Sequence, residues 1–217
     1  MRRFRVACVV VGAAFMAASV QAQPQPAAAP APPPRPRAVV VMTLDSPAWP
    51  DGGVIPLTHS QVGRDVSPPL SWSGAPEGVV SYVLIVRDLD ALLPATGEDT
   101  LHWLVWNIPG SSASLPEGVP HGNAPPAPPR VGGGPAPPPT DGLRQTSGTG
   151  PAYRGPAAPA SGPVHHYVFE VFALDIWLDV PAVGQSPAAT RGTVLAAMVG
   201  HVRGKGVRVG VFRRPLP

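Results

Sequence analysis

Hydrophobic positions gather in short stretches rich in Val, Ile, Tyr, Phe and Trp, which is typical of β-strands. Five such stretches predict strands at 38–44, 79–86, 101–108, 164–174 and 206–213. Residues 191–202 instead repeat apolar side chains at helical spacing and are followed by Gly204, which predicts one helix. Many short strands with one late helix favour a mainly β domain, a β-sandwich with a C-terminal helix packed at its end.

The chain begins with the pattern of a secretory signal peptide. Arg2, Arg3 and Arg5 precede an apolar run over 6–18, and small residues suited to cleavage end at Ala22. We therefore predict a signal peptide over 1–22 and an exported protein, either periplasmic or secreted. The apolar run is shorter than the roughly 20 residues that cross a bilayer, so we expect no transmembrane segment in the mature protein.

Proline and glycine divide the rest of the chain, which holds 33 prolines and 24 glycines. Residues 23–38 are mostly Pro and Ala and predict an extended linker. The domain is expected over 39–217, with a Pro/Gly-rich insertion at about 119–150 that is long for a loop inside a domain. This insertion could bind a protein partner.

Composition narrows the function classes. Removing the predicted signal peptide takes three arginines and no acid from 16 basic and 13 acidic residues, so the remaining charges balance and nucleic acid is not an expected partner. Cys8, the only cysteine, leaves with the signal peptide, which excludes disulfides. No glycine-rich phosphate loop joins a strand to a helix, which disfavours a nucleotide-binding α/β fold.

Candidate chemistry lies at the ends of the predicted strands. Asp88 and Asp90 follow the strand over 79–86, and alternation along an extended chain places both carboxylates on one side. On spacing alone, an ordinary Asp-rich turn is the simpler interpretation. His102 begins another apolar strand, where a hydrogen-bonded edge histidine is more usual than a ligand.

Alternation also separates the two adjacent histidines. It places His165 and Tyr167 on one face of their strand and His166 on the other, so only His165 should share a pocket with Tyr167. Upstream, the proline-punctuated loop over 153–159 has few amide donors, but its stiff backbone could aim them at an anion.

Six segments together resemble the phosphatidylethanolamine-binding protein family, in the bacterial branch often labelled Raf-kinase-inhibitor-like. They occur in the expected order and cover most of 39–213 apart from the insertion: Ser67-Pro-Pro-Leu-Ser-Trp72, Asp88-Leu-Asp-Ala91, His102-Trp-Leu-Val-Trp-Asn107, Tyr153-Arg-Gly-Pro156, His165-His-Tyr-Val-Phe169 with Ala173-Leu-Asp175, and Ala197-Met-Val-Gly-His201. The resemblance implies a β-sandwich with a pocket for phosphate, phosphoethanolamine-like head groups or acetate. Its implied binding residues are Asp88, Asp90, His102, Gly155, Ala157, His165 and Tyr167, with Tyr153 supporting the loop.

The implied donors suit an anionic or zwitterionic ligand. Imidazoles and a phenol donate to oxyanions, while aspartates can fix the histidine tautomers, raise their pKa and accept from an ammonium group. Three departures from the family pattern remove stiffening or supporting residues: Leu89 and Leu92 replace prolines, His166 replaces an arginine, and Ala157-Ala158-Pro159 stands for Cys-Pro-Pro.

The sequence therefore predicts a binding protein for a small anionic or zwitterionic ligand, without catalytic residues, metal or cofactor. Two alternatives stay open. One is a metal-assisted hydrolase or a lyase that uses the same Asp/His cluster. The other is a protein-interaction module of the protease- or kinase-inhibitor type, which would use the Pro-rich insertion.

Overall fold

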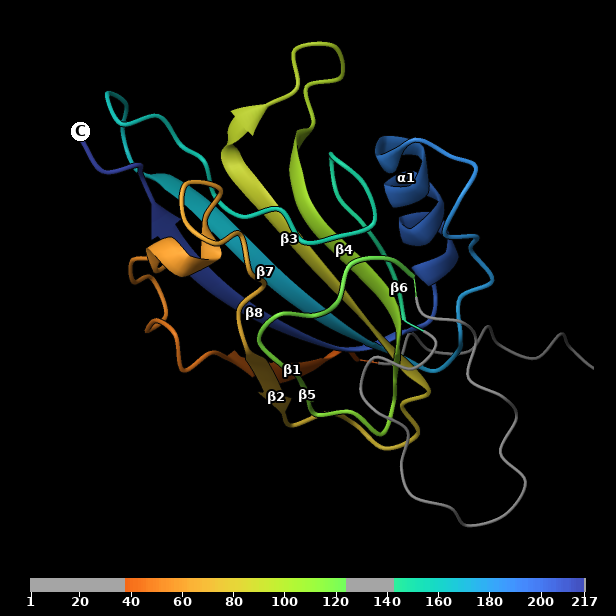
Figure 1. The fold of residues 1–217 in the computed structure, drawn as a ribbon. Coiled ribbons are helices and arrows are strands. Elements are labelled where there is room, and N and C mark those ends of the chain that lie inside the picture. The colour runs from red at the N-terminus through yellow and green to blue at the C-terminus, as the bar shows by residue number, and fades with distance from the viewer. Residues whose placement is uncertain (1–37, 124–142, 217) are drawn as a thin grey trace, which may run out of the picture. The chain divides into compact units, whose positions relative to one another are not determined.

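Eight strands form one hydrogen-bonded sheet in the computed structural model, which describes residues 38–123 and 143–216 (Figure 1). Its strand order is β5-β2-β1-β8-β7-β3-β4-β6. The long antiparallel centre joins β7, β3 and β4, and β1 pairs in parallel with β8, the last strand of the chain. The elements are β1 (Val40–Asp45), the 3₁₀ turn η1 (Leu57–His59), β2 (Leu70–Ser73), β3 (Ser81–Leu92), β4 (Asp99–Pro109), β5 (Ser114–Leu115), β6 (Arg144–Thr146), β7 (His165–Leu174), α1 (Pro187–Met198) and β8 (Val202–Phe212).

The prediction of a mainly β domain with one late helix is confirmed, although the helix begins and ends four residues earlier than expected. It begins at Pro187, because the Ser186 side chain accepts a hydrogen bond from the Ala189 amide and proline suits the first helical turn. It ends at Met198, shortly before Gly200, which adopts a φ of 82°. Residue 202, expected in the helix, starts β8 instead.

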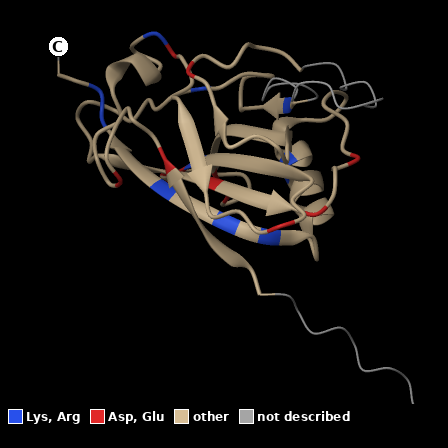
Figure 2. Cartoon of the chain, turned by 90° about the horizontal axis from the view of Figure 1, so that it is seen from below, with Lys and Arg blue, Asp and Glu red and all other residues tan. Residues whose placement is uncertain are grey.

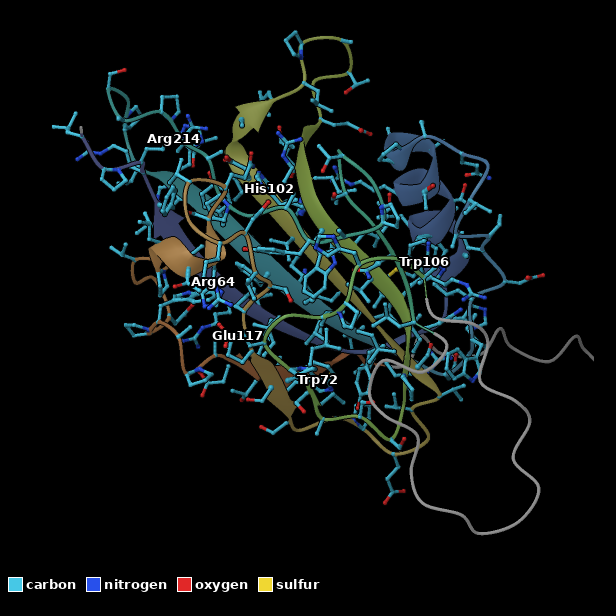
Figure 3. The ribbon with its side chains drawn as sticks, in the orientation of Figure 1. Arg64, Trp72, His102, Trp106, Glu117 and Arg214 are labelled. Atoms are coloured by element: carbon cyan, nitrogen blue, oxygen red, sulfur yellow. The ribbon has the colours of Figure 1, made fainter. Side chains whose placement is uncertain are left out.

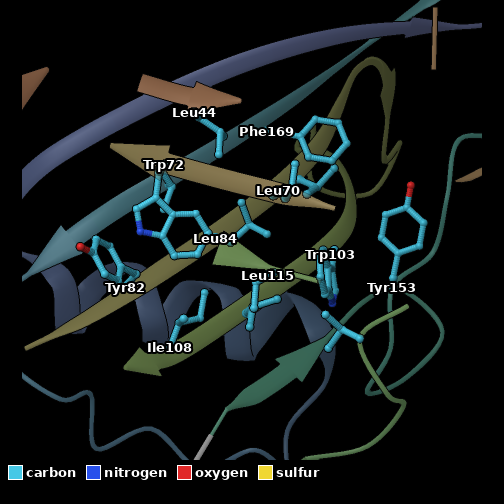
Figure 4. Close-up of a cluster of buried hydrophobic side chains, with 14 of the residues drawn as sticks. Leu44, Leu70, Trp72, Tyr82, Leu84, Trp103, Ile108, Leu115, Tyr153 and Phe169 are labelled. Atoms are coloured by element: carbon cyan, nitrogen blue, oxygen red, sulfur yellow. The ribbon is translucent and has the colours of Figure 1, made fainter. Parts of the chain in front are cut away.

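The two layers expected of a sandwich belong here to a single sheet that curls over its own core. Side chains from β1 and β2 contact those from β3, β4 and β7 in one buried cluster, although these strands lie in different parts of the ladder. Figure 4 shows this cluster, with Trp72 beside Tyr82 and Phe169 near Leu70. Burial of these large apolar side chains is the main stabilising contribution to the fold.

The opposite face of the sheet carries α1 and a chain of ion pairs. Val194 and Met198 of α1 pack with side chains of β3, β4 and β7 in a second buried cluster. Beside it, Asp99 pairs with Arg191 at 2.7 Å and with Arg87 at 2.6 Å. Glu170 continues the chain, at 2.6 Å from both Arg87 and Lys205. Basic and acidic segments are accordingly interleaved across the strands in Figure 2.

The predicted Pro/Gly-rich insertion is partly a component of the domain. Its middle, 124–142, lies outside the described residues, as do the predicted signal peptide and all but the last residue of the linker. Its flanks belong to the domain, because Val119 and Leu143 are buried and Arg144–Thr146 forms β6 on the edge of β4. No helix in the described ranges is long and apolar enough to span a membrane.

Candidate functional site

A cavity of about 510 Å³ opens where β3, β4 and β7 meet the loops at one end of the sheet. His102, which lines it, lies toward the end of the sheet opposite Trp72 (Figure 3). Its other lining residues are Gln61, Asp88, Ala91, Leu93, Thr100, Leu101, Gly148, Arg154, Ala157, Ala158, Pro159, His165 and Tyr167. The cavity therefore gathers five of the seven predicted binding residues, and Asp90 and Gly155 are not among its lining.

A buried carboxylate and an imidazole form the polar centre of this cavity. Asp88 is 3% exposed, and its Oδ2 lies 2.8 Å from His165 Nδ1. Because a carboxylate accepts, His165 carries a proton on Nδ1, and Nε2 is the ring atom left to meet a ligand. Asp88 Oδ1 accepts from the Asp90 amide at 3.0 Å, so both carboxylate oxygens are hydrogen-bonded.

Tyr167 stands beside this pair on the same face of β7. Burial, reinforced by the negative charge of Asp88, raises the pKa of the Tyr167 phenol well above its usual value, so the hydroxyl keeps its proton. The hydroxyl oxygen accepts a long hydrogen bond of 3.3 Å from the Ala157 amide. It thereby joins strand β7 to the loop over 154–159.

His102 is held by backbone and not by an aspartate. Its Nδ1 donates to the Arg154 carbonyl at 2.8 Å, and its ring meets the Tyr167 ring edge-on at 5.1 Å. Burial lowers the pKa of His102, although the Arg154 carbonyl and Asp88 act in the opposite direction. Asp88 thus raises this pKa as expected, but burial outweighs it, so the expectation that the charged donor form is favoured is wrong for His102.

The loop over 154–159 is fixed by its own amides, which sequence reasoning assigned to the ligand. The Gly155 amide donates to Asp65 Oδ1 at 2.7 Å, and its carbonyl accepts from Gln61 Nε2 at 2.7 Å. A Cβ at Gly155 would lie 2.1 Å from the His59 carbonyl oxygen, which explains the glycine. Tyr153 supports the same region, because its hydroxyl donates to the His59 carbonyl at 2.8 Å. Gly155 thus positions the cavity wall.

Asp90 departs from the predicted arrangement. Its Oδ2 accepts from the His166 amide at 2.6 Å and lies 2.9 Å from His166 Nδ1, on the exposed side of the sheet. Alternation fails here because the pairing between β3 and β4 is irregular from Asp88 to Leu92. The His166 amide lowers the pKa of Asp90, with help from the His166 ring.

Sequence reasoning missed three polar residues of the cavity. Arg154 is a half-buried residue that brings a guanidinium, and none of the ion pairs found among the described residues involves it. Gln61 comes from the loop after η1, and Thr100 precedes His102 on β4. Residues in loops give no periodic signal. Arg154 could still have been found, because it lies inside a motif that resembles the family's.

Two imidazoles, one phenol and one guanidinium give this cavity several hydrogen-bond donors around a single buried carboxylate. Such a set can hold an oxyanion, and the Asp88 carboxylate can face a cationic group of the same ligand. The described residues contain no group of three or more His, Cys, Asp or Glu side chains placed to hold a metal ion.

Comparisons with known proteins agree with the fold. The family model described as phosphatidylethanolamine-binding protein matches residues 45–213. A UPF0098 protein of Methanothermobacter thermautotrophicus is 38% identical over 176 residues, which cover 80% of this chain and 99% of the relative. A Mycobacterium tuberculosis protein named "Putative lipoprotein LppC" is 33% identical over 172 residues, covering 79% of this chain and 72% of the relative.

Solved structures show the same similarity. A phosphatidylethanolamine-binding protein homologue from Chlamydia trachomatis superposes with a TM-score of 0.60 at 28% identity, and YbcL from Escherichia coli gives 0.60 at 25% identity. Each comparison covers 80% of this chain and 98% of the other. The chain therefore belongs to the phosphatidylethanolamine-binding protein family.

Proposed function

We propose that this protein is an exported binding protein whose cavity takes a small anion, either phosphate or a phosphoethanolamine-like head group. The observation that carries the proposal is the buried Asp88–His165 pair, which stands with His102 and Tyr167 around one cavity. A polar cluster at this depth stabilises the fold less than apolar side chains of equal size would, which favours a role in binding.

Each donor would meet the ligand through an atom that the protein leaves available. His165 and His102 are both fixed at Nδ1, so both rings offer Nε2 to the cavity. Because Nδ1 carries the proton of each neutral ring, both His102 and His165 must take up a second proton to donate from Nε2. Arg154 adds a permanent positive charge, while Asp88 would receive the ammonium group of a zwitterionic head group.

Export is proposed from two independent observations. Residues 1–22 have the composition of a signal peptide, and one of the relatives is named as a putative lipoprotein. Fractionation of cells that produce the full chain tests this part: we expect a shortened chain outside the cytoplasm. Recovery of the uncleaved chain in the cytoplasm would contradict export.

Calorimetry tests the binding proposal, with inorganic phosphate and phosphoethanolamine as probes. We expect both to bind the unmodified chain and to lose most of their affinity in His102→Ala and in His165→Ala. Circular dichroism would show whether each variant is folded. Failure of both probes to bind, or unchanged binding in the two folded variants, would contradict the proposal.

The hydrolase or lyase alternative stays a prediction from the sequence. It differs from pure binding in a measurable way, because phosphoethanolamine would be consumed with time and inorganic phosphate or an aldehyde would appear. Metal analysis of protein purified without chelator belongs to the same experiment. Turnover that is lost in His165→Ala would favour the enzyme over the binding protein.

A further inference from the structure

Irregular pairing surrounds the part of β4 that lines the candidate cavity. The ladder with β3 skips His102, which lies at an irregularity between Leu101 and Trp103. Closer to the start of β4, the ladder skips residues 89–91 of β3. Residues 99–101, which contribute to the cavity wall, are therefore paired between two irregular points, where backbone hydrogen bonds hold them less firmly.

Asp99, the first residue of this stretch, is held by side chains. Its carboxylate lies 2.7 Å from Arg191 of α1 and 2.6 Å from Arg87 of β3. A second nitrogen of Arg191 donates to the main-chain carbonyl of Asp99 at 3.1 Å. Arg191 thus contacts both the side chain and the backbone of one residue, which a forked guanidinium can do and a single ammonium cannot do equally well.

The contact between Arg191 and Asp99 is largely shielded from water. Their side chains are 13% and 12% exposed, so water and salt screen the attraction less than they would on the surface. Arg191 is also fixed by its helix, because Val194, one turn further along α1, is fully buried against the sheet. A pair with so little freedom can fix the backbone at the start of β4.

Arg191 stands outside the site that it supports. It is not among the lining residues of the candidate cavity, so any effect on a ligand there is indirect. Thr100 follows Asp99 directly, and its hydroxyl donates to the Ala91 carbonyl at 2.8 Å, which ties the skipped part of β3 to the same stretch. A displacement of Asp99 would therefore reach both strands of the cavity wall.

We infer that Arg191 is a positioning residue of the candidate site: it holds the start of β4 so that Thr100 and His102 keep their places in the cavity wall. The inference rests on the proposed function as far as ligand affinity is concerned. It goes beyond that function because it assigns a part in binding to α1, which contributes no residue to the cavity lining.

Arg203 of β8 offers a matched control for Arg191. It also pairs with a carboxylate, that of Asp175, and donates to a main-chain carbonyl, that of Gly200, at 3.0 Å. It lies near the beginning of β8, whereas the cavity residue His165 pairs with the end of that strand. Its replacement removes the same kind of contacts far from the cavity.

Phosphate affinity and one histidine signal test the inference on the full chain. Calorimetry with inorganic phosphate should show about a three- to tenfold loss of affinity in Arg191→Gln, as for one weakened charge-assisted hydrogen bond. Arg203→Gln should change the affinity less than about twofold. NMR of histidine labelled in the ring reports the His102 Nδ1 proton, which donates to the Arg154 carbonyl. This proton should exchange with water faster in Arg191→Gln and at an unchanged rate in Arg203→Gln.

The outcomes separate positioning from a merely structural role. Circular dichroism shows whether each variant is folded, and Arg191→Lys, which keeps the charge but not both contacts, replaces Arg191→Gln if the latter does not fold. Equal losses of affinity in the Arg191 and Arg203 variants would overturn the inference. An unchanged His102 signal in the folded Arg191 variant would overturn it too, and so would faster exchange with unchanged phosphate affinity. If phosphate does not bind the unmodified chain, the proposed function fails, and the His102 signal still decides whether Arg191 positions this ring.

Discussion

Two Asp–His pairs lie side by side where β3 meets β7. They consist of the same residue types but differ in exposure to solvent. Asp88 and His165 are 4% and 15% exposed at their side chains, whereas Asp90 and His166 are 40% and 53% exposed. The ion-pair distances are nearly equal, at 2.8 and 2.9 Å. The inner pair lines the cavity with Tyr167, and the outer pair faces solvent.

The difference shows that environment, and not residue type, separates a candidate binding pair from a surface pair. A solvated pair is screened by water and contributes little, whereas a buried pair must be fully hydrogen-bonded to be tolerated. Asp88 meets this condition through His165 and the Asp90 amide. Asp90 is therefore a matched control for Asp88, and His166 is one for His165.

Replacing Asp88 and Asp90 one at a time should give the largest difference between the two pairs, measured as the free energy of unfolding. We expect Asp88→Ala to lower the free energy of unfolding by about 2–3 kcal/mol, because it leaves buried donors unpaired. Asp90→Ala should cost under about 1 kcal/mol. Denaturant unfolding measures both values. Equal losses would mean that burial does not distinguish the two carboxylates.

Replacement of the two histidines tests the same contrast by ligand affinity. His165→Gln removes a donor beside the proposed phosphate and should weaken phosphate binding about 10- to 100-fold, as expected for a charge-assisted hydrogen bond. His166→Gln should change it less than about twofold. Calorimetry at neutral pH is the measurement. Loss of binding in His166→Gln would place the ligand on the exposed face.

His102 adds a third case to the comparison, because its ring is hydrogen-bonded to the Arg154 carbonyl and not to a carboxylate. Burial lowers the pKa of His102, and donation to an anion requires its charged form, so binding takes up a proton. We expect sulfate, whose charge is constant here, to bind more tightly as pH falls from about 7 to about 5, by at most about tenfold per unit per proton. His102→Gln should reduce this dependence, while His165, which also needs a second proton to donate from Nε2, stays in place. Asp88, Arg154, His165 and Tyr167 are unchanged between the two proteins.

The smallest expected effect concerns the outer pair. The His166 amide and ring lower the pKa of Asp90, so this carboxylate stabilises the folded protein above its unfolded pKa and loses that contribution as pH falls through the lowered value. Asp90→Asn should thus be slightly less stable than the unmodified chain at pH 7, and the difference should vanish near pH 3 or below. Thermal unfolding across this range checks the sign.

The long elements of the fold could be predicted because their signal is local. The strands β3, β4 and β7 are dense in β-branched and aromatic residues over ten or more positions. The short strands β2, β5 and β6 owe their existence to partners far away in the sequence, so composition did not reveal them. Residues 144–146 even lay within the stretch predicted as an insertion.

The site divides in the same way. Alternation assigned His165 and not His166 to the face of Tyr167, because the pairing of β7 with β8 is regular through this point. It failed for Asp90, where the ladder of β3 with β4 becomes irregular. Arg154 and Gln61 were missed because only tertiary structure brings these loops to the cavity. The amides of Gly155 and Ala157 were expected to face a ligand, but both have partners inside the protein.

The position of β8 has a consequence for how this chain folds. β8 lies between β1 and β7. The edge of β1 that faces β8 can therefore pair only with residues some 160 positions later in the sequence. Closing so long a loop is entropically costly, and folds dominated by such contacts form slowly. Until the last strand arrives, the edges of β1 and β7 are unprotected and open to association with other chains.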